Sequence, residues 1–519
     1  MPVTVPGSPA TGSPNVTLSM GTGDVLHLAQ QISNLLSTEQ STGNLSVSSV
    51  SGSSTTLPAA PVVPGTTTEL LIQSSSPINA VIPAGYNYVL PIGPGGDTLT
   101  GSNVDIIAGT IGGTFYVSGA STVAPLGGNN TVAASGNYVL SFSAGNNVVI
   151  ADGAGTVATD SGTSTVVASN LTGSANLIES NGTGDFIAAT YGTNTVNATG
   201  SGVRILGGAG ALFSNVSGSG AIVSTGQTNA AIAISGSNGA VFGGNGLLLV
   251  DDTGSGTTVV AATGAASVVA AGSNELIVGG SGGLNVTVSG ANDTISTGTA
   301  PSTITASSNA LVFGGSAALT FVGGAGTATV VGGSGGSEQI TGGAGGVLFS
   351  ADQSNTGTFT NGSGTSTIFG GSGSVTNFNS SLGGGILVAF GGNETLNAAG
   401  STTAATLSGG NIPGSQADLI GGSGPNVLFA GVGSDTFTGG GSSDTFAFFA
   451  SATSGGQDAI TDFNASDSLF LLGYDSTKSA VGTNASGHVT LTLSDSTTIT
   501  FTNLTDTTAL NGHYLFGNQ

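Results

Sequence analysis

The chain has 519 residues, of which 93 are glycine, and it contains no cysteine and no tryptophan. Only two side chains, Arg204 and Lys478, are basic, against 25 acidic residues, so the formal net charge is −23. This charge should repel nucleic acid and anionic membranes. The three histidines, His27, His488 and His513, are too far apart in the sequence to suggest a zinc site. No apolar run approaches the ~18 residues of a membrane span, and an oxygen-rich chain with few cations favours calcium over softer metals.

Residues 1–80 are rich in Ser, Thr, Pro and Gly, which predicts an extension without a hydrophobic core of its own. Inside this extension, apolar residues at helical spacing predict a short amphipathic helix over residues 24–37, capped by Asp24 or Thr22. The residues at this spacing are Val25, Leu28, Ile32, Leu35 and Leu36. We expect the helix to cover the open end of the following domain, with docking to a partner or to a second copy as the alternative. Residues 41–76 are expected to be a linker that holds a strand or two at most.

Residues 81–410 repeat short apolar groups at intervals of about nine residues, each followed by Gly, Ser, Asn or Asp. Val166-Val167, Val259-Val260 and Val330-Val331 are examples. Frequent glycine excludes helices, whereas β-branched anchors favour short strands joined by tight turns. A unit this short cannot bury its own apolar side chains, so it must stack on its neighbours. We therefore predict an all-β fold, a right-handed parallel β-roll or β-helix solenoid with two units per coil, a short N-terminal helix and a C-terminal β cap.

The repeat becomes regular within residues 411–450. Residues 421–429 read Gly-Gly-Ser-Gly-Pro-Asn-Val-Leu-Phe, and residues 430–438 and 439–447 continue the pattern in register. These three nonapeptides resemble the calcium-binding repeat of the RTX family, Gly-Gly-x-Gly-x-Asp-x-(apolar)-x. The resemblance implies that the turns of successive coils supply oxygen ligands for one to three Ca²⁺ ions. The candidate ligand positions in these repeats and just before them are Asp418, Gly422, Gly424, Asn426, Gly431, Gly433, Asp435, Gly440 and Asp444.

Residues 451–519 are expected to close the solenoid. The segment 455–472 resembles the closing module of RTX proteins and of serralysin-type C-terminal domains. Its matching residues are Asp458, Asp462, Phe463 and Asp467, and the three aspartates are further candidate metal ligands. Period-two alternation at residues 488–493 and 497–501 predicts antiparallel strands that stop edge-to-edge growth. By the same resemblance, the last ~60 residues would contain an uncleaved signal for a type I secretion machine, which agrees with the lack of a signal-peptide pattern at the N-terminus.

Residues 81–410 look like an eroded form of the same repeat. Most of their turns carry Asn, Ser or Thr where the family has Asp, as at Asn147, Ser164 and Asn194. We therefore expect few calcium ions in this section. Its isolated acids, which we expect to be solubilising surface charge, include Asp185, Asp293 and Glu394.

A β-helical enzyme acting on polysaccharides is one alternative function. Lyases and epimerases of acidic sugars place Lys, Arg or His beside the substrate, and residues 81–410 offer Arg204 alone among these residue types. A pair of carboxylates could hydrolyse glycosides, but Asp251 and Asp252 are adjacent and should point to opposite faces of a strand. We therefore predict that the chain is not an enzyme.

A glycan- or ice-binding adhesin module is the other alternative. Regular rows of Thr on one face would support ice binding, and aromatic platforms would support sugar binding. Thr is abundant, but along the sequence its register drifts from unit to unit, and only seven Tyr and no Trp are present.

The function that we expect is structural, outside a bacterial cell, as a surface-layer subunit, a biofilm matrix protein or an extracellular fibre. The mean hydropathy is +0.33 with only 5% charged residues, which leaves the surface poorly protected against self-association. The expected partners are further copies of the chain and the type I secretion machinery, with a cell-surface glycan as a further candidate. Calcium is expected to lock the C-terminal coils after export.

Overall fold

The computed structural model of the chain describes residues 3–6, 15–18, 24–109, 111–169, 175–334, 336–352, 356–371, 377–380, 383–450 and 455–517. The chain divides into two units, Met1–Gly264 (unit 1) and Ala265–Gln519 (unit 2). Each unit is a parallel β-solenoid, and the two units together contain about 21 turns and one N-terminal helix. The prediction of a nearly all-β parallel solenoid is therefore confirmed.

The described residues of unit 1 form the helix α1 (Asp24–Thr42) and 23 strands. The strands are β1 (Val3–Pro6), β2 (Asn15–Leu18), β3 (Leu45–Gly52), β4 (Thr67–Ser74), β5 (Asn79–Val81), β6 (Tyr88–Pro91), β7 (Thr98–Ser102), β8 (Asp105–Ala108), β9 (Thr114–Ser118), β10 (Ser121–Pro125), β11 (Thr131–Phe142), β12 (Val148–Thr159), β13 (Thr165–Ala168), β14 (Ala175–Ser180), β15 (Phe186–Ala189), β16 (Thr193–Ala198), β17 (Arg204–Gly207), β18 (Ala211–Val216), β19 (Ile222–Ser224), β20 (Ala230–Ile234), β21 (Ala240–Phe242), β22 (Leu248–Asp252) and β23 (Thr258–Val260).

Unit 2 contains short strands and two 3₁₀ turns, η2 (Ser476–Lys478) and η3 (Thr507–Leu510). Its strands are β24 (Ala266–Ala270), β25 (Leu276–Val278), β26 (Leu284–Val288), β27 (Asp293–Ser296), β28 (Ser302–Ala306), β29 (Ala310–Phe313), β30 (Leu319–Gly323), β31 (Ala328–Val331), β32 (Ser337–Thr341), β33 (Val347–Ser350), β34 (Thr356–Asn361), β35 (Ser366–Phe369), β36 (Asn377–Ser380), β37 (Gly385–Val388), β38 (Asn393–Asn397), β39 (Thr406–Ser408), β40 (Gln416–Ile420), β41 (Val427–Phe429), β42 (Thr436–Thr438), β43 (Thr445–Phe449), β44 (Gln457–Ile460), β45 (Ser468–Leu472), β46 (Ala480–Thr483), β47 (Val489–Thr492), β48 (Thr498–Phe501) and β49 (Tyr514–Gly517).

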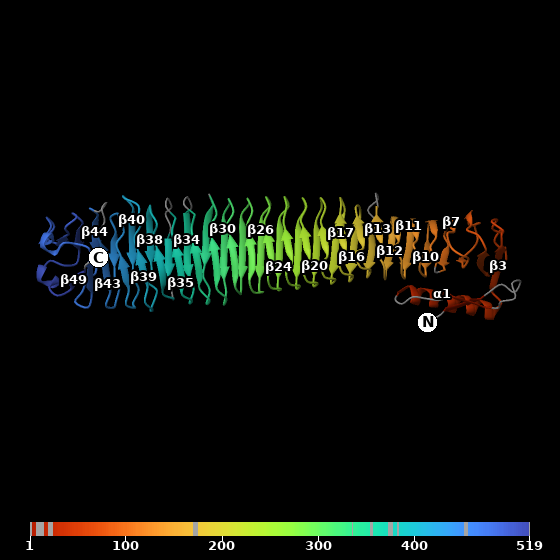
Figure 1. Cartoon of the computed structure of the whole chain (residues 1–519), viewed down its shortest axis with the longest axis horizontal. Helices are drawn as coiled ribbons and strands as arrows, with labels where there is room; N and C mark the ends of the chain where they lie inside the picture. Colours follow the sequence, from red (N-terminus) through yellow and green to blue (C-terminus); the bar gives the residue numbers. More distant parts are fainter. Residues whose placement is uncertain are drawn as a thin grey trace. The chain divides into compact units, whose positions relative to one another are not determined.

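In each unit the strands form two parallel ladders, in which a strand pairs with its counterparts one coil earlier and one coil later (Figure 1). In unit 2, ladder A consists of the even-numbered strands β24 to β44 followed by β48, and ladder B of the odd-numbered strands β25 to β45 followed by β49. In unit 1, ladder A runs from β3 and β4 to β22 and ladder B from β5 to β23, and the long strands β11 and β12 contribute to both ladders. Two strands per coil is the arrangement that the nine-residue repeat predicted.

The length of a coil varies, but the register of the ladders is kept. Stacked corner residues are separated by 17 positions at Asn130 and Asn147, by 18 at Ala417 and Asp435, and by 23 at Asp435 and Asp458. The extra residues lie in the turns, because the strands on both sides continue to pair residue by residue. The spacing of the repeat therefore varies along the sequence while the register of the paired strands is unchanged.

Alternate side chains of each strand fill the interior of the coil. In β28, Ile304 is fully buried, while Thr303 and Thr305 face outward. The largest fully buried side chains of unit 2 include Phe321, Phe349, Phe359, Phe437 and Phe446. Burying one such side chain contributes roughly 1.5–3 kcal/mol, so a single nine-residue segment gains little alone and the stacked column supplies the stability.

The outward residues of ladder B in unit 2 form two regular rows. Row 1 is Leu276, Thr294, Leu311, Thr329, Leu348, Thr367, Ile386, Thr406, Val427 and Thr445. Row 2 is Val278, Ser296, Phe313, Val331, Ser350, Phe369, Val388, Ser408 and Phe429. Row 1 alternates a large aliphatic residue with Thr, row 2 repeats Val, Ser and Phe, and neither row holds a charged residue.

Ladder A of unit 2 presents mainly hydroxyl and amide groups outward. Row 3 contains Thr303, Thr320, Thr358, Thr395 and Thr436. Row 4 contains Thr287, Thr305, Thr341, Thr360 and Thr438. The Thr residues of ladder A in unit 2 therefore share two rows, which residues such as Val322, Gln339 and Asp418 interrupt.

The helix α1 lies along the side of the first coils of unit 1, next to strands from β3 to β11 (Figure 1). Its buried residues Ile32 and Leu36 pack on an outward row of ladder A made by Leu71, Leu90, Ile107 and Ala124. The helix begins at Asp24 as predicted and ends at Thr42, five residues later than predicted; Thr22, the other cap candidate, lies outside the described residues. The helix covers a side of the solenoid, whereas we had expected it to cover an open end.

The solenoid of unit 1 begins inside the segment that composition assigned to an extension. The strands β3 and β4 pair in parallel over eight residues, and β4 pairs with β6. Leu70, Leu71 and Ile72 supply the apolar residues for this first coil and are fully buried. A short apolar run between Ser- and Thr-rich segments is therefore sufficient to form a strand of the solenoid.

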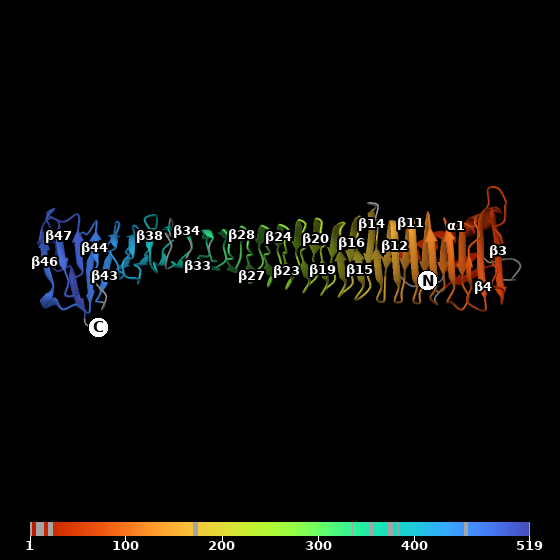
Figure 2. The same cartoon turned by 90° about the horizontal axis from the view of Figure 1, so that it is seen from above.

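At the C-terminal end of unit 2, β46, β47 and β48 form an antiparallel meander (Figure 2). β48 also continues ladder A in parallel with β44, and β49 continues ladder B after β45. The antiparallel pair predicted at residues 488–493 and 497–501 corresponds to β47 and β48. None of the helices in the described part of the chain is long and apolar enough to cross a membrane.

Candidate functional site

Five of the predicted ligand positions, Asn426, Asp435, Asp444, Asp458 and Asp467, lie at two inner corners of the coil, just before a strand or at its start. At the ladder A corner, Asp435 Oδ1 accepts a hydrogen bond from the backbone N–H of Ala417 at 2.9 Å, and Asp458 Oδ1 accepts one from the N–H of Asp435 at 2.8 Å. Asp435 Oδ2 also accepts from the N–H of Gly431 at 2.7 Å. Each carboxylate therefore links its own coil to the coil before it, and both are buried.

The ladder B corner follows the same rule with Asn426, Asp444 and Asp467. Asp444 Oδ1 accepts from the backbone N–H of Asn426 at 2.8 Å, and Asp467 Oδ1 accepts from the N–H of Asp444 at 2.9 Å. All three side chains are at most 1% exposed. The structure thus separates the sequence-predicted ligands into two columns, one for each ladder.

Asn426 brings a donor to its corner, in contrast to the aspartates. Its amide Nδ2 lies within hydrogen-bond distance of four oxygens: the carbonyls of Gly422 at 3.0 Å, Gly424 at 2.7 Å and Gly439 at 3.0 Å, and Asp444 Oδ1 at 3.0 Å. An amide nitrogen surrounded by oxygens occupies the kind of place that a cation would take. In this structure the amide of Asn426 donates to these oxygens, and its assignment as a calcium ligand stays a prediction.

Asp444 differs from Asp435 and Asp467, whose two oxygens each accept a hydrogen bond, because one of its oxygens is left over. Asp444 Oδ2 is buried and accepts no hydrogen bond from the described residues, and it lies against Gly439, where a Cβ atom would come within 2.5 Å of it. The pKa of Asp444 is raised to about 6, mainly by burial and in smaller part by the nearby carboxylates of Asp467 and Asp462. An unpaired buried oxygen beside other acids is a poor arrangement for a bare carboxylate.

The donor set at Asp444 fits calcium better than softer metals, because it consists of carboxylate and carbonyl oxygens. The fit is partial. Asp462 already accepts from the N–H groups of Gly439 and Gly440, both at 2.8 Å, and Asp467 Oδ2 accepts from Asn464 N at 2.9 Å. Among the described residues, no group of three or more His, Cys, Asp or Glu side chains is arranged to hold a metal ion.

Three of the remaining predicted positions are Asp418, Gly433 and Gly440. Asp418 is half-buried and lies between Thr395 and Thr436 on the outward face of ladder A, so it is not brought together with the inward acids. Gly433 allows close stacking, because a Cβ atom there would lie 1.9 Å from the carbonyl oxygen of Ser415. Gly440 has a φ of +107°, a backbone conformation that favours glycine.

The isolated acids of residues 81–410 were expected to be surface charge, and this expectation was wrong. Asp185 and Asp293 are fully buried and Glu394 is 3% exposed. Asp185 accepts hydrogen bonds from Ser164 N, Thr159 Oγ1 and Ser180 Oγ, each at 2.7 Å. Backbone N–H groups freed at the corners require buried acceptors, so these acids and the asparagines Asn130 and Asn147 stabilise the corners.

Sequence reasoning missed Glu69, which is fully buried in β4 with no hydrogen bond to either carboxylate oxygen from the described residues. Desolvation by burial raises its pKa to about 8. The available signal was an acid inside the apolar run Thr-Glu-Leu-Leu-Ile. Glu394 is similar, with its pKa raised to about 8 by burial despite a hydrogen bond from Phe390 N at 3.1 Å.

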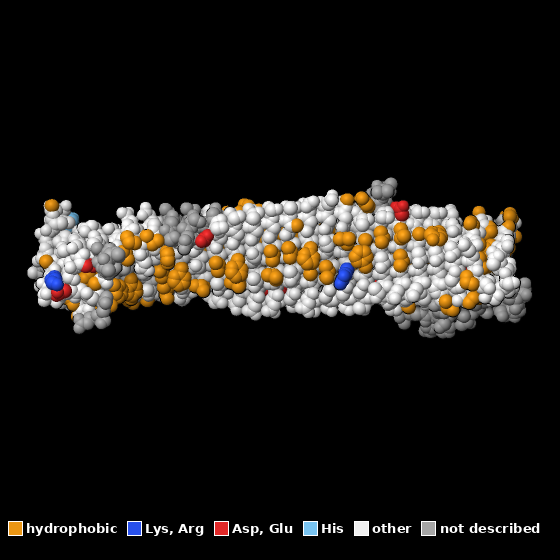
Figure 3. Space-filling model, turned by 45° about the horizontal axis from the view of Figure 1, so that its top comes forward, with side chains coloured by type: hydrophobic (Ala, Val, Ile, Leu, Met, Phe, Trp, Pro, Cys, Tyr) orange, Lys and Arg blue, Asp and Glu red, His pale blue; other side chains and the backbone are white. Residues whose placement is uncertain are grey.

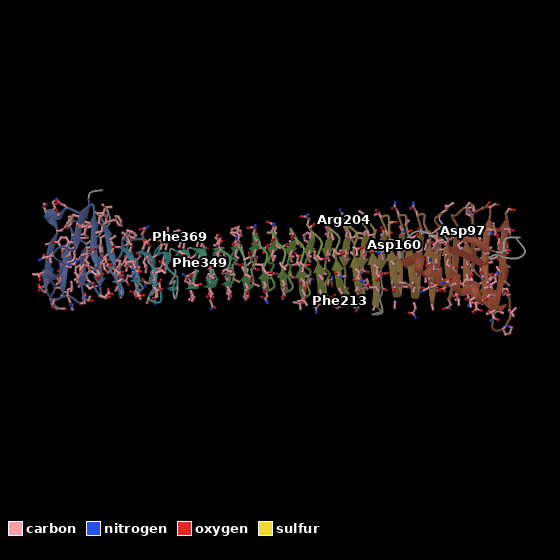
Figure 4. The ribbon with its side chains drawn as sticks, turned by 90° about the horizontal axis from the view of Figure 1, so that it is seen from below. Asp97, Asp160, Arg204, Phe213, Phe349 and Phe369 are labelled. Carbon is pink, nitrogen blue, oxygen red and sulfur yellow. The ribbon has the colours of Figure 1, made fainter. Side chains whose placement is uncertain are left out.

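The residues considered for enzymatic chemistry do not converge. Arg204 is exposed on ladder B of unit 1 between Phe186 and Ile222, on the face opposite Phe213 (Figure 4). Asp251 is exposed, whereas its neighbour Asp252 is fully buried and accepts from Gly254 N at 2.8 Å. The two carboxylates therefore face opposite sides of β22.

Comparison with known proteins adds no family to this description. No protein-family model matches the chain, and no curated protein matches it either.

Proposed function

We propose that the chain is a secreted, non-enzymatic structural protein of the bacterial cell surface, a subunit of a surface layer, a biofilm matrix or an extracellular fibre. The observation that carries this proposal is the in-register stacking of coils in each unit, which in unit 2 repeats a few outward residue types along each row. A repetitive face makes many equivalent weak contacts, and assemblies of identical subunits depend on such contacts.

The proposed absence of enzymatic activity is supported by the placement of the charged groups. Arg204 stands in an apolar row, and Asp251 and Asp252 are divided between the outside and the inside of the coil. Neither arrangement provides a general acid and base that face one substrate.

The resemblance to RTX repeats supports calcium binding at the C-terminal coils of unit 2. Asp444 would hold the ion through its unpaired Oδ2, together with Asp467 and carbonyl oxygens of the adjoining turn. The ion would neutralise buried carboxylates that otherwise repel one another. Because calcium is scarce in the cytosol, these coils would fold fully only after export, which suits the proposed type I route.

Calcium binding is tested by thermal unfolding of the full chain with calcium and with a chelator. We expect calcium to raise the melting temperature, since a ligand at 100 times its Kd adds about 2.7 kcal/mol to stability. The double variant Asp435→Ala, Asp444→Ala should lose most of this shift, and Asp418→Ala, on the outward face, should keep it. A double variant with the wild-type response would contradict the site.

The structural function is tested by electron microscopy of the purified chain in calcium and by fractionation of the producing cells. We expect fibres or sheets and an extracellular or surface-bound protein. Monodisperse monomers at high concentration in calcium would refute the assembly, and a protein retained inside the cell would refute the location.

The rows of Thr favour a second candidate function, binding to ice or to a neutral glycan. In rows 3 and 4, Thr side chains of neighbouring coils, as in the pairs Thr287–Thr305 and Thr341–Thr360, lie at the ~4.8 Å spacing of stacked strands. Thermal hysteresis of freezing, or retention on a neutral polysaccharide, would support this candidate if Thr303→Lys with Thr358→Lys abolishes it. Wild-type protein without either property would remove it.

A further inference from the structure

Rows 1 and 2 form an apolar band along ladder B of unit 2 that the described residues leave exposed (Figure 3). Leu348 is 43% exposed, Phe369 42% and Ile386 46%, although all three stand in the middle of the ladder. Figure 4 shows the contrast between Phe349, which lies inside the coil, and Phe369, which points outward. Monomeric proteins rarely expose contiguous apolar patches beyond a few hundred Å².

Unit 1 shows what happens to such a row when a partner is present. The row of Leu71, Leu90, Ile107 and Ala124 on its ladder A is at most 4% exposed, because α1 lies over it. Rows 1 and 2 are the equivalent feature in unit 2, and no described element covers them. In unit 1 a helix of the same chain therefore covers the apolar row, whereas in unit 2 no described element covers rows 1 and 2.

The open band is large enough for a stable contact between two chains. The exposed Leu, Ile, Val and Phe side chains of ladder B amount to on the order of 600 Å² per copy, close to the ~800 Å² per partner of a standard interface. The rows contain no charged residue in a chain of net charge −23, so a second copy meets no like charge there. The acidic remainder of the chain disfavours other acidic partners.

The periodicity of row 1 also fits a second copy. Large residues alternate with Thr at each coil, so bulky side chains recur at about twice the ~4.8 Å strand spacing. A second identical row, displaced by one coil, places each large side chain opposite a Thr. In row 2, the recurring Ser residues leave similar gaps beside Phe313, Phe369 and Phe429.

We propose that rows 1 and 2 of ladder B form a self-complementary face by which unit 2 pairs with the same face of a second copy of this chain. The inference rests on the proposed structural function and names the contact surface for it. Sheet-to-sheet packing of this kind brings the two faces to about 10 Å. The paired strands remain within their own coils, so only outward side chains change their surroundings.

The test is sedimentation of the full chain over a range of concentrations. The double variant Leu348→Glu, Phe369→Glu places two charges in the band, and Gln339→Glu with Thr358→Glu places two on the outward face of ladder A as a matched control. A charge buried without a partner costs on the order of 100-fold in affinity or more, so the band variant should dissociate and the control should not. Circular dichroism checks that both variants remain folded, which is expected because all four positions face outward.

Because the chain has no cysteine, single cysteines provide a second readout. Thr329→Cys in row 1 should give a covalent dimer with a bifunctional thiol cross-linker long enough to span the two faces, about 10 Å apart, and Thr358→Cys in row 3 should not. If wild-type chains assemble and both double variants assemble equally, the band is not the interface, and the structural function still stands. If the wild-type chain stays monomeric at every concentration, the inference and the assembly both fail.

Discussion

Asn426 and Asp444 occupy the same corner position in successive coils but bring opposite electrostatics to it. The amide of Asn426 donates toward carbonyl oxygens and toward Asp444 Oδ1, whereas Asp444 can only accept and keeps one oxygen unpaired. Asn130 repeats the amide arrangement in unit 1, where its Nδ2 reaches Gly127 O at 3.1 Å and Asn147 Oδ1 at 2.9 Å. The amide of Asn426 thus supplies a donor to the oxygens of its corner, whereas Asp444 leaves one of its own oxygens without a donor.

The substitution Asn426→Asp should therefore make a corner calcium-dependent. Without calcium, the new carboxylate faces the carbonyls of Gly422 and Gly424 as well as Asp444, and we expect a loss of about 2–4 kcal/mol in the free energy of unfolding. With calcium, most of this loss should be recovered. Urea denaturation with calcium and with a chelator measures both values. Thr436→Asp, which adds the same charge on an exposed position, should cost little in either condition; a loss in the variant that calcium does not reduce would disprove the reading of Asn426.

At the scale of the strand and its turn, stability depends on how closely successive coils approach. A Cβ atom at Gly290 would lie 1.4 Å from the carbonyl oxygen of Gly272 in the coil before it. The turns therefore stack backbone on backbone, and glycine is needed there for lack of space. The ladders on both sides cannot yield, because each strand pairs with the strand in the next coil.

Gly290→Ala should force two coils of unit 2 apart and lower the free energy of unfolding by about 1–3 kcal/mol or more. Gly441→Ala is the matched control, since a Cβ atom there meets nothing within 4 Å, and it should change stability by a few tenths of a kcal/mol. Thermal or urea unfolding compares the two. Equal effects would mean that the close approach of the turns does not limit stacking.

The period of the apolar groups predicted the solenoid, the two strands per coil and the antiparallel pair near the C-terminus. The outward rows could not be predicted, because turns of different length shift the sequence period while the strands stay paired. Leu348 and Thr367 are neighbours in row 1 only through this pairing. At the candidate site, the sequence motif pointed to the residues of the repeats. It could not predict their division into two corners or the donor role of Asn426, because both depend on which ladder each turn serves.

At the scale of the whole molecule, several buried acids have raised pKa values. Burial raises the pKa of Glu69 and of Glu394 to about 8, of Asp458 to about 7 and of Asp444 to about 6. In the unfolded chain the same groups release their protons near pH 4. Between these values the folded chain holds protons that the unfolded chain has lost.

Stability should therefore fall as the pH rises from about 4.5 to about 8 and level off above that, in the absence of calcium. The direction of this change follows from the raised pKa values. The contribution of such a carboxyl group to stability is complete below its pKa in the unfolded chain, where the group is protonated in both states, and is lost as the pH rises through its pKa in the folded chain. Each unit of pKa shift corresponds to about 1.4 kcal/mol. Melting temperatures measured with a chelator from pH 4.5 to pH 9 test this trend, and Glu69→Gln with Glu394→Gln should flatten it by removing the two largest contributions. Asp251→Asn, at an exposed position, should leave the slope unchanged; stability that rises with pH in the wild-type chain would show that these carboxyl groups are ionised in the folded state.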